Sequence, residues 1–428
     1  MVNVNDFKGQ NDNERIENAI KNKDSDGIVI IPPRISETES ERQTYLLDRA
    51  ILVPENTTII LENCKIKLSD KCRDNFFRTT NCGLGIPYPE KIQNVHIKGI
   101  GHVVLEGADH PRACGDSSKI LANPCPYTDT DLLKIAPWVS DERKKNGKLT
   151  FSDRHDHSYG TDAGKEGESQ YGDWRGIGVL FANADGFSIE NITIVCSHGW
   201  GISLEACTNG RVEKIEFDAC MSKEIDGMLH NMENQDGIDI RNGCHDIVIS
   251  DITGRTGDDL IALTAIAGDY EKDIPGGSLK CTHVMHNDWT KRDKNIHNII
   301  IRNVMGYSHL CYLIRLLPAC TNIWNVVIDG VIDTTPEEIT AFGGILLGDD
   351  GTYGENLQNS VSNVTISNVV CNRPDAVCVE GYVADSVITN VINRRKGCCA
   401  VKIKNKNGLK NTKISNLTTV DTEPIIQM

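Results

Sequence analysis

The sequence predicts a right-handed parallel β-helix, an all-β solenoid made of stacked coils. From about residue 186 onward one phrase recurs: a short alternating strand, a turn with Asn or Gly, and a second strand of the form N-I/V-x-I, as in GFSIENITI and GIDIRNGCHDIVISDI. The period is about 20 to 25 residues, and no helix is long enough for a βα crossover. Each coil would bury its inward Ile, Val and Leu side chains against the next coil.

Two other repetitive or all-β architectures fit less well. A leucine-rich repeat would carry the phrase LxxLxLxxN, which is missing, and most periods here carry two NxI-type strands. A β-sandwich would show hairpin turns between its strands, whereas this chain repeats one sequence phrase along its length. We therefore expect residues 1–428 to form a single β-helix domain, with the N-terminal cap and first coils in 1–100.

The first element is a predicted capping helix. A parallel β-helix leaves one end of a long apolar core open, and that end must be covered. The segment NDNERIENAIKNK, residues 11–23, places Ile16, Ala19 and Ile20 at helical spacing. It therefore predicts an N-terminal helix that closes the core.

Two stretches interrupt the repeat, 109–173 and 268–295. The first is rich in Pro, Gly, His and charged residues, and neither has enough apolar periodicity for a core of its own. We expect both to be long loops over one face of the β-helix.

The charge balance argues against two classes of partner. The net charge is −15, with 39% hydrophobic and 25% charged residues, which disfavours nucleic-acid backbones and anionic membranes. The opening residues lack the pattern of a secretory signal, and no run of about 18 apolar residues occurs. We expect a cytoplasmic protein, or a secreted one whose leader has been removed.

The sixteen cysteines do not form a metal-binding pattern. A cluster at Cys281, His283 and His286 could hold zinc, but there is no CxxC and no repeated ligand pair, so an ordinary polar loop is favoured and no metal is expected. Several others lie in strand-like runs, where a thiol is usually a small buried hydrophobe. These are Cys196, Cys207, Cys220, Cys244, Cys371 and Cys378.

Two acidic phrases, NQDGIDI and GDDLIAL, lie about one period apart. Asp236 precedes Asp258 by 22 residues, so coils stacked at about 4.8 Å would place them side by side. If Ile238 and Ile240 point inward, Asp239 points outward. On the next coil the same alternation would turn Leu260 and Ala262 inward and Asp259 outward. Three or four carboxylates would then crowd one patch of the outer surface.

Crowded carboxyl groups suit glycoside hydrolysis. Like charges at short range cannot all ionise normally, so at least one proton is held near neutrality. Hydrolysis needs one protonated carboxyl for the leaving oxygen and one carboxylate to activate water. Two alternatives remain on spacing alone: Asp and Asn that merely fill turns, or a calcium site.

The same residues carry a family resemblance. SHGWGISLEACTNGRVEKI, followed by NQDGIDI and GDDLIAL, resembles the core of glycoside hydrolase family 28, the polygalacturonase-like pectinases, whose phrases are NTDGIDI and GDDCIAI. DFKGQNDNERIENAI resembles the family's opening, and NVHIKGIGHVVLEG resembles the strand before its first long loop. The resemblance implies a right-handed parallel β-helix and hydrolysis with inversion. Asp258 would be the general acid, Asp236 and Asp259 would hold and activate water, and no cofactor or metal would be needed.

Two later motifs of that family are incomplete here. Its Gly-His-Gly triplet is absent, and His309 is the best counterpart. Arg315 would supply the arginine of its Arg-x-Lys motif, with Leu317 in place of the lysine. Counting coils instead pairs YLIRLL with the Gly-His-Gly coil and leaves the next coil, GGILLG, without a basic residue. We expect His309, Arg315, Asp239 and Arg255 to bind substrate.

The resemblance implies a saccharide partner, namely a pectin-like galacturonide, rhamnogalacturonide or related oligosaccharide, and long loops beside the acids favour exo action. A second GDD, residues 348–350, lacks a following apolar run and is read as a turn that contributes at most to a cleft. One alternative is a calcium-dependent polysaccharide lyase with Arg255 or Arg315 as its base. The other is a non-catalytic carbohydrate-binding β-helix, such as an adhesin.

Overall fold

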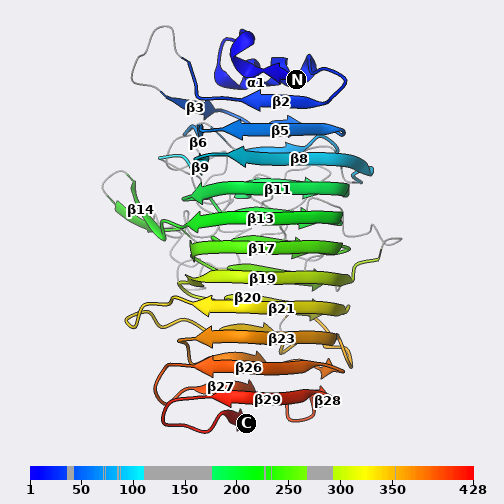
Figure 1. The fold of residues 1–428 in the computed structure, drawn as a ribbon, viewed down its shortest axis with the longest axis vertical. Helices are drawn as coiled ribbons and strands as arrows, with labels where there is room; N and C mark the ends of the chain where they lie inside the picture. Colours follow the sequence, from blue (N-terminus) through cyan, green and yellow to red (C-terminus); the bar gives the residue numbers. More distant parts are fainter. Residues whose placement is uncertain are drawn as a thin grey trace, which may run out of the picture.

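The chain is a right-handed parallel β-helix with its N-terminus at one end of the stack and its C-terminus at the other (Figure 1). The computed structural model describes residues 1–35, 43–70, 72, 74–83, 86, 88–109, 176–225, 228–232, 234–267, 293–351 and 353–428. The predicted fold class is confirmed. Among these residues the strands of successive coils pair in parallel, and one hairpin, β14 (Ser222–Ile225) with β15 (Met228–Asn231), is antiparallel.

One sheet consists of short strands, one from each coil, and is called here the short-strand sheet. It has eleven strands among the described residues. In order along the stack they are β4 (Ile51–Val53), β7 (Phe77–Thr79), β10 (Val179–Ala182), β12 (Ile202–Glu205), β16 (Ile238–Arg241), β18 (Ile261–Ile266), β20 (Ile314–Ala319), β22 (Ile345–Leu347), β24 (Asp375–Val379), β27 (Cys399–Ile403) and β30 (Ile425–Gln427).

The remaining strands between coils form the long-strand sheet, which faces the viewer in Figure 1. They are β1 (Val2–Asn3), β2 (Ile28–Ile31), β3 (Thr44–Leu47), β5 (Thr57–Glu62), β6 (Lys65–Leu68), β8 (Ile92–Ile100), β9 (Val104–Glu106), β11 (Ala184–Val195), β13 (Thr208–Asp218), β17 (His245–Thr256), β19 (Ile296–Ser308), β21 (Ile323–Asp333), β23 (Val361–Cys371), β25 (Val383–Ala384), β26 (Val387–Asn393), β28 (Leu409–Lys410) and β29 (Lys413–Thr418).

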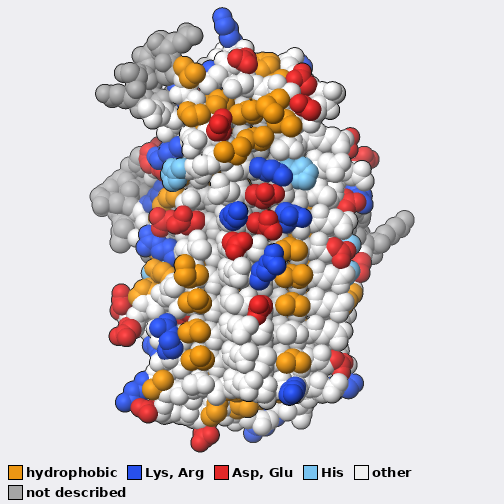
Figure 2. Space-filling model, viewed as in Figure 1, with side chains coloured by type: hydrophobic (Ala, Val, Ile, Leu, Met, Phe, Trp, Pro, Cys, Tyr) orange, Lys and Arg blue, Asp and Glu red, His pale blue; other side chains and the backbone are white. Residues whose placement is uncertain are grey.

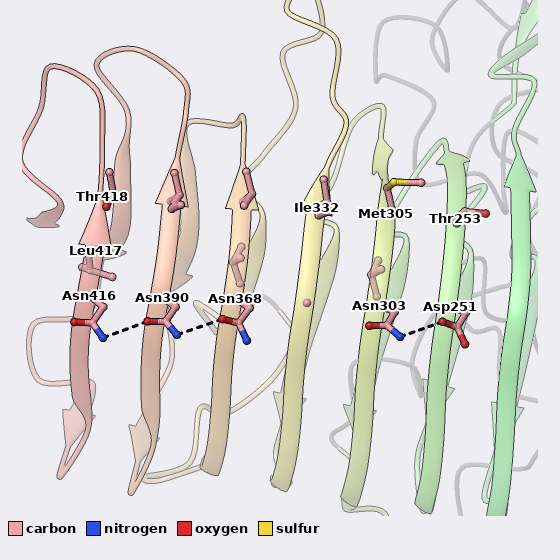
Figure 3. A pocket seen from close by; sticks show the side chains of 15 residues that line it. Asp251, Thr253, Asn303, Met305, Ile332, Asn368, Asn390, Asn416, Leu417 and Thr418 are labelled. Carbon is pink, nitrogen blue, oxygen red and sulfur yellow. Dashed lines mark hydrogen bonds between the residues drawn. The ribbon is translucent and has the colours of Figure 1, made fainter.

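The Asn of the recurring N-I/V-x-I phrase bends the long strands. The φ values of Asn303, Asn368, Asn390 and Asn416 are 56°, 57°, 56° and 54°, in the left-handed region that Asn tolerates better than most residues. Along the helix axis Asn416 donates to Asn390 at 3.2 Å and Asn390 to Asn368 at 3.2 Å, and on the other side of Gly330 Asn303 donates to Asp251 at 3.1 Å (Figure 3). These side chains form an amide ladder in two parts. The repeat therefore supplies both the bend and the bonds that link neighbouring coils.

A shallow groove of about 860 Å³ follows this ladder over the long-strand sheet (Figure 3). Exposed aliphatic side chains form columns beside the groove, because Met305 pairs with Ile332 and Ile300 pairs with Val327 in the strand register. Figure 2 shows such columns on this face of the molecule. The groove is lined mainly by amides and aliphatic groups, and the aspartates of the sequence motifs lie in or just before strands β16 and β18 of the short-strand sheet.

The predicted capping helix is confirmed as α1 (Asp12–Lys21), which follows the 3₁₀ helix η1 (Val4–Asp6) and covers the N-terminal end of the core (Figure 1). Asn11 caps it by accepting a bond from the backbone N–H of Glu14 at 2.9 Å, and Glu14 accepts in return from Gln10 N–H at 2.8 Å. Ile16 and Ala19 are fully buried. Among the described residues, none of the helices has the length and hydrophobicity that a bilayer crossing requires.

The core runs without interruption from Val4 to Ile403. Four of the six cysteines predicted to be buried are buried in the structure, namely Cys207, Cys244, Cys371 and Cys378. Cys196 and Cys220 are half-buried, because both follow the ends of long strands rather than lying within them.

The predicted insertions 109–173 and 268–295 lie outside the described residues, apart from Asp109 and residues 293–295. The Cys281, His283 and His286 cluster lies outside them as well.

Candidate active site

The two acidic phrases lie on adjacent coils, but their register differs from the predicted one. β16 and β18 pair Ile238 with Ile261 and Asp239 with Ala262, an offset of 23 residues rather than 22. Ile261 and Leu263 therefore point inward in place of Ala262, which lies on the outer side opposite Asp239. Leu260 is buried as predicted.

One extra residue in the second turn causes this change. The N–H groups of Gly257 and Asp258 both donate to the Gln235 carbonyl, at 3.0 and 3.3 Å, whereas Gly237 N–H donates to the Asp259 carbonyl at 2.9 Å. Two residues, Asp258 and Asp259, thus lie beside Asp236, as in a β-bulge. Such bulges redirect side chains, and this one brings both acids of GDD toward the acid of NQD.

The carboxyl cluster, defined here as Asp236, Asp239, Asp258 and Asp259, is less open than the predicted surface patch. Asp236, Asp239 and Asp259 expose 7%, 1% and 2% of their surface, and Asp258 is half-buried. Asp258 is thus the member of the cluster with the most access to a bound molecule.

Burial and mutual repulsion keep protons in this cluster. Burial, followed by repulsion from Asp258, raises the pKa of Asp236 well above its usual range. Burial likewise raises the pKa of Asp239, against the attraction of Arg241. Burial raises the pKa of Asp259 to about 6, although Arg315 and the Tyr312 N–H favour its ionised form. Among the described residues, Asp236 Oδ1 and Asp239 Oδ2 have no hydrogen-bond partner.

Asp259 is fixed from both sides. Its Oδ1 accepts a 2.8 Å bond from Tyr312 N–H on the following coil, and its Oδ2 lies 3.4 Å from Nη1 of Arg315. Its own N–H donates to Asp258 Oδ1 at 2.9 Å, and the Asp258 carbonyl accepts from Thr256 Oγ1 at 2.8 Å. The two acids of GDD therefore have defined positions relative to each other.

Gln235 is a positioning residue that motif reading missed. It is buried, its Oε1 accepts from Met221 N–H at 3.1 Å, and its Nε2 donates to the Ser197 carbonyl at 2.7 Å. It thus ties the turn before Asp236 to the two preceding coils. Its only sequence signal is its place beside the aspartate in NQD.

Cys311 joins the cluster from the following coil. Ligand atoms of Asp258, Asp259 and Cys311 all lie within 4.8 Å of one another, the one such group found among the described residues. Burial, then the nearby carboxylates, raises the pKa of the Cys311 thiol, so the thiol stays neutral. Calcium prefers a set of oxygen ligands, which does not include a thiol. The donor set does not match the calcium site of the lyase alternative.

His309 and Arg255 lie together at the rim. The His309 side chain is half-buried, and its ring centroid lies 5.4 Å from that of Tyr307. The backbone N–H of His309 donates to the Thr256 carbonyl at 2.9 Å. Burial, then Arg255, lowers the pKa of His309. Arg255 bonds Asp218 Oδ1 at 2.7 Å. Among the described side chains, no hydrogen bond or ion pair joins His309 or Arg255 to the carboxyl cluster.

The strand order shows which coils carry Arg315 and its neighbours. β20, with Arg315, directly follows β18, and β22 follows β20. Arg315 pairs with Ala262 on one side and Leu346 on the other, so Leu346 occupies the next outward position. Leu317 pairs with Thr264 and is buried. Arg315 is the basic group that contacts Asp259.

The second GDD lies in the bend after β22, as predicted. Asp349 accepts bonds from the N–H groups of Gly351 at 2.9 Å and Tyr353 at 3.2 Å. The bend places the Tyr353 ring against Arg315, whose guanidinium carbon is 5.3 Å from the ring centroid. The motif thus supports the site through Tyr353.

Two further aromatic groups flank the cluster. On the preceding side Arg241 lies over the Trp200 ring, 4.7 Å from its centroid. On the following side the Tyr312 and Phe342 rings lie 5.6 Å apart, and Phe342 is 58% exposed. An exposed aromatic face beside polar groups can stack on a sugar ring.

No protein-family model matches the chain, and no curated protein sequence matches it. Solved structures do match. The surface adhesin PfbA of Streptococcus pneumoniae aligns with a TM-score of 0.55 at 13% identity, covering 99% of this chain and 98% of the adhesin. An exopolygalacturonase from Thermotoga maritima aligns with a TM-score of 0.50 at 15% identity, covering 99% and 92%.

A tailspike protein of E. coli bacteriophage HK620, solved in complex with a hexasaccharide, aligns with a TM-score of 0.52 at 12% identity, covering 100% of this chain and 64% of the tailspike. At these identities the likeness concerns architecture alone, and the same fold occurs in an enzyme, an adhesin and a tailspike. The chain has the parallel β-helix fold of these proteins.

Proposed function

We propose that this protein is a glycoside hydrolase that cleaves a glycosidic bond with inversion, acting on a pectin-like galacturonide, rhamnogalacturonide or related oligosaccharide. The observation that carries the proposal is the bulge that gathers Asp236, Asp258 and Asp259 from two adjacent coils. A turn that merely satisfied its own backbone would not bury three carboxyl groups against one another, because each pays a desolvation cost.

The members of the cluster are suited to different roles. Asp258 is half-buried, and we assign it the proton donor to the glycosidic oxygen as that bond breaks. Asp259, whose ionised form is favoured by Arg315 and Tyr312 N–H, accepts a proton from water as the water oxygen attacks the sugar carbon. Asp236 holds that water. Both acids return to their starting protonation by exchange with solvent.

Arg315 and the aromatic rim suit substrate binding. Arg315 lies against Asp259 and Tyr353, where one cation could meet a single sugar carboxylate. Asp239, next to Arg241, supplies hydrogen-bonding atoms deeper in the site. Arg255 and His309 lie at the rim and would meet a more distant part of the saccharide.

The experiment is a panel of galacturonides, rhamnogalacturonides and neutral oligosaccharides incubated with the wild type and Asp258→Asn. Proton NMR of the first product reports the anomer, and inversion is expected. A slow fall in viscosity with early release of small sugars would support exo action on a polymer, whereas a rapid fall would show internal cleavage.

A non-catalytic saccharide-binding role is the second candidate, because an adhesin aligns along nearly its whole length. It predicts saccharide binding without turnover, and binding that survives Asp258→Asn. The lyase alternative predicts unsaturated products that absorb in the ultraviolet and activity that a chelator abolishes.

A further inference from the structure

We propose that Arg373 is a positioning residue that holds the base Asp259 in place through a single peptide group, the one joining Cys311 to Tyr312. The carbonyl of that peptide accepts a 2.5 Å bond from Arg373 Nη1, and its N–H donates a 2.8 Å bond to Asp259 Oδ1. This inference rests on the proposed role of Asp259. It adds a residue that lies beyond both acidic motifs.

Arg373 is fully buried, which is unusual for an arginine and calls for compensation. Most of its donors are used on backbone carbonyls. Nη2 donates to Ser308 at 2.8 Å, and Nη1 also lies 3.4 Å from the carbonyls of both Phe342 and Gly343. One guanidinium therefore connects the turn before β20 with the turn before β22.

The counter-charge is Asp333, which is also fully buried and lies 3.5 Å from Arg373 Nε. Asp333 is held by backbone donors of its own, since Oδ1 accepts from Thr335 N–H at 3.0 Å and Oδ2 from Asn372 N–H at 2.7 Å. Arg373 Nε bonds Thr335 Oγ1 at 3.1 Å. This arrangement anchors the guanidinium and leaves its Nη groups directed at the two turns.

The peptide between Cys311 and Tyr312 transmits the effect. A trans peptide is planar, and its C=O and N–H point in opposite directions, so fixing the oxygen also fixes the N–H. A cation at the oxygen polarises the group and makes the N–H a stronger donor in a buried setting. Arg373 thereby both aims the Tyr312 N–H and strengthens its bond to the Asp259 carboxylate.

Other charged or titratable groups face Asp259, so the contribution of Arg373 must be separated from theirs. Asp258 and the Cys311 thiol lie beside it, and Arg315 lies on the following coil. Asp236 and Asp239 lie on the preceding coil. Within the part of the chain that the structure describes, Arg373 is the charged group that donates a hydrogen bond to the Cys311 carbonyl.

The same guanidinium also supports the aromatic rim. Its bonds to Phe342 and Cys311 place the backbone of Phe342 and Tyr312, whose rings lie 5.6 Å apart. Loss of Arg373 should therefore affect the binding of a sugar at this rim as well as Asp259. A KM effect and a kcat effect have separate origins and can be measured separately.

The test compares Arg373→Gln, Arg373→Lys and Arg373→Met. Gln and Met remove the charge, and we expect kcat to fall about 10- to 100-fold and the acid limb of the pH profile to move up by about 0.5 to 1 unit. Lys keeps a charge in the same place, so its acid limb should stay close to that of the wild type. The proposal is overturned if the acid limb stays in place in Arg373→Gln and Arg373→Met. It is also overturned if the acid limb moves as far in Arg373→Lys as in those two variants.

Carbon-13 NMR of labelled aspartates gives the pKa of Asp259 without any substrate, with Asp259→Asn assigning its signal. It separates failure of this inference from failure of the proposed hydrolase activity. If Gln and Met do not fold, Arg373→Lys still decides: a signal for Asp259 that titrates as in the wild type supports the inference, and one displaced upward overturns it.

The matched control is Arg78→Met. Arg78 is another buried arginine, whose Nε donates to the Cys82 carbonyl at 3.0 Å, and it lies on β7, three strands before β16 in the short-strand sheet. We expect it to lower Tm while leaving the acid limb and the Asp259 signal unchanged. An equal displacement in this control would show that general loosening of the fold is enough, which contradicts a specific role for Arg373.

Discussion

The backbone N–H of Tyr312 donates a 2.8 Å hydrogen bond to Oδ1 of Asp259, so the backbone of one coil fixes a carboxyl group of the coil before it. On the opposite side, Asp236 lies beside both acids of GDD because of the bulge between their turns. Asp259 thus bonds Tyr312 on the following coil and lies beside Asp236 on the preceding coil. The predictions below follow from its position and its surroundings.

The pH dependence of activity should follow the ionisation of Asp259. Burial raises its pKa to about 6, so the proposed base is protonated and inactive below that pH. We expect kcat/KM to rise through about pH 6 as Asp259 ionises. Initial rates on the best oligosaccharide between pH 4 and 9 measure this profile. A kcat/KM that is flat from pH 4 to 7 would contradict the role of Asp259.

Stability should increase when a buried carboxyl of the cluster is made neutral. The folded-state pKa of Asp239 is raised by burial, so its contribution to stability is fully present below its unfolded pKa and is lost as pH rises through the folded one. Asp239→Asn should therefore raise Tm by a few degrees at pH 8, with little change near pH 4.

Asp251→Asn is the control for this experiment, because it removes an exposed carboxylate from β17. We expect its Tm to differ from that of the wild type by a similar amount at both pH values. If Asp239→Asn lowers Tm at pH 8, the buried carboxylate is stabilising and our view of the cluster is wrong.

Cys220 should be the more reactive thiol of the pair Cys196 and Cys220. Hydrogen bonding with Cys196 lowers the pKa of Cys220 to about 7 against the effect of burial, whereas the same contact raises the pKa of Cys196. Thiolates are the reactive form, so alkylation of Cys220 should increase through about pH 7. Peptide mass mapping after brief iodoacetamide treatment measures it. Faster labelling of Cys196 at pH 7 would be the opposite result.

Arg315 should matter for both chemistry and substrate choice. Arg315→Met removes the cation 3.4 Å from Asp259 and leaves that carboxyl buried beside Asp258, so kcat/KM should fall about 10²-fold or more, with an upward shift of the acid limb. Arg315→Lys keeps the charge and should retain more activity. Comparison of galacturonides with neutral sugars completes the test. An equal loss on both classes would argue that Arg315 does not read a sugar carboxylate.

The repeat made the fold predictable from the sequence. The phrase N-I/V-x-I combines inward aliphatic residues with an Asn that tolerates the left-handed bend. The bend recurs from coil to coil, with Lys214, Asp251 and Gly330 in place of the Asn on β13, β17 and β21. The capping helix was predictable for the same reason, since Ile16, Ala19 and Ile20 share one face. These are local patterns that do not depend on distant parts of the chain.

The site was predictable only in part. The spacing of Asp236 and Asp258 indicated neighbouring acids, but the bulge depends on one added residue, and that changed which side chains point inward. Arg373 lies 114 residues beyond Asp259, and its link to the site depends on how two turns pack. No local pattern marks an arginine that binds backbone carbonyls. The positioning role of Arg373 could be inferred only from its hydrogen bonds in the structure.

The most direct test of the central claim is turnover of the saccharide panel by the wild type and by Asp258→Asn, with Asp251→Asn as the control that keeps the cluster intact. We predict that the wild type and Asp251→Asn hydrolyse at least one acidic oligosaccharide and that Asp258→Asn loses about 10²-fold or more in kcat while remaining folded. Equal turnover by Asp258→Asn and the wild type, or no turnover of any saccharide by the wild type, would contradict it.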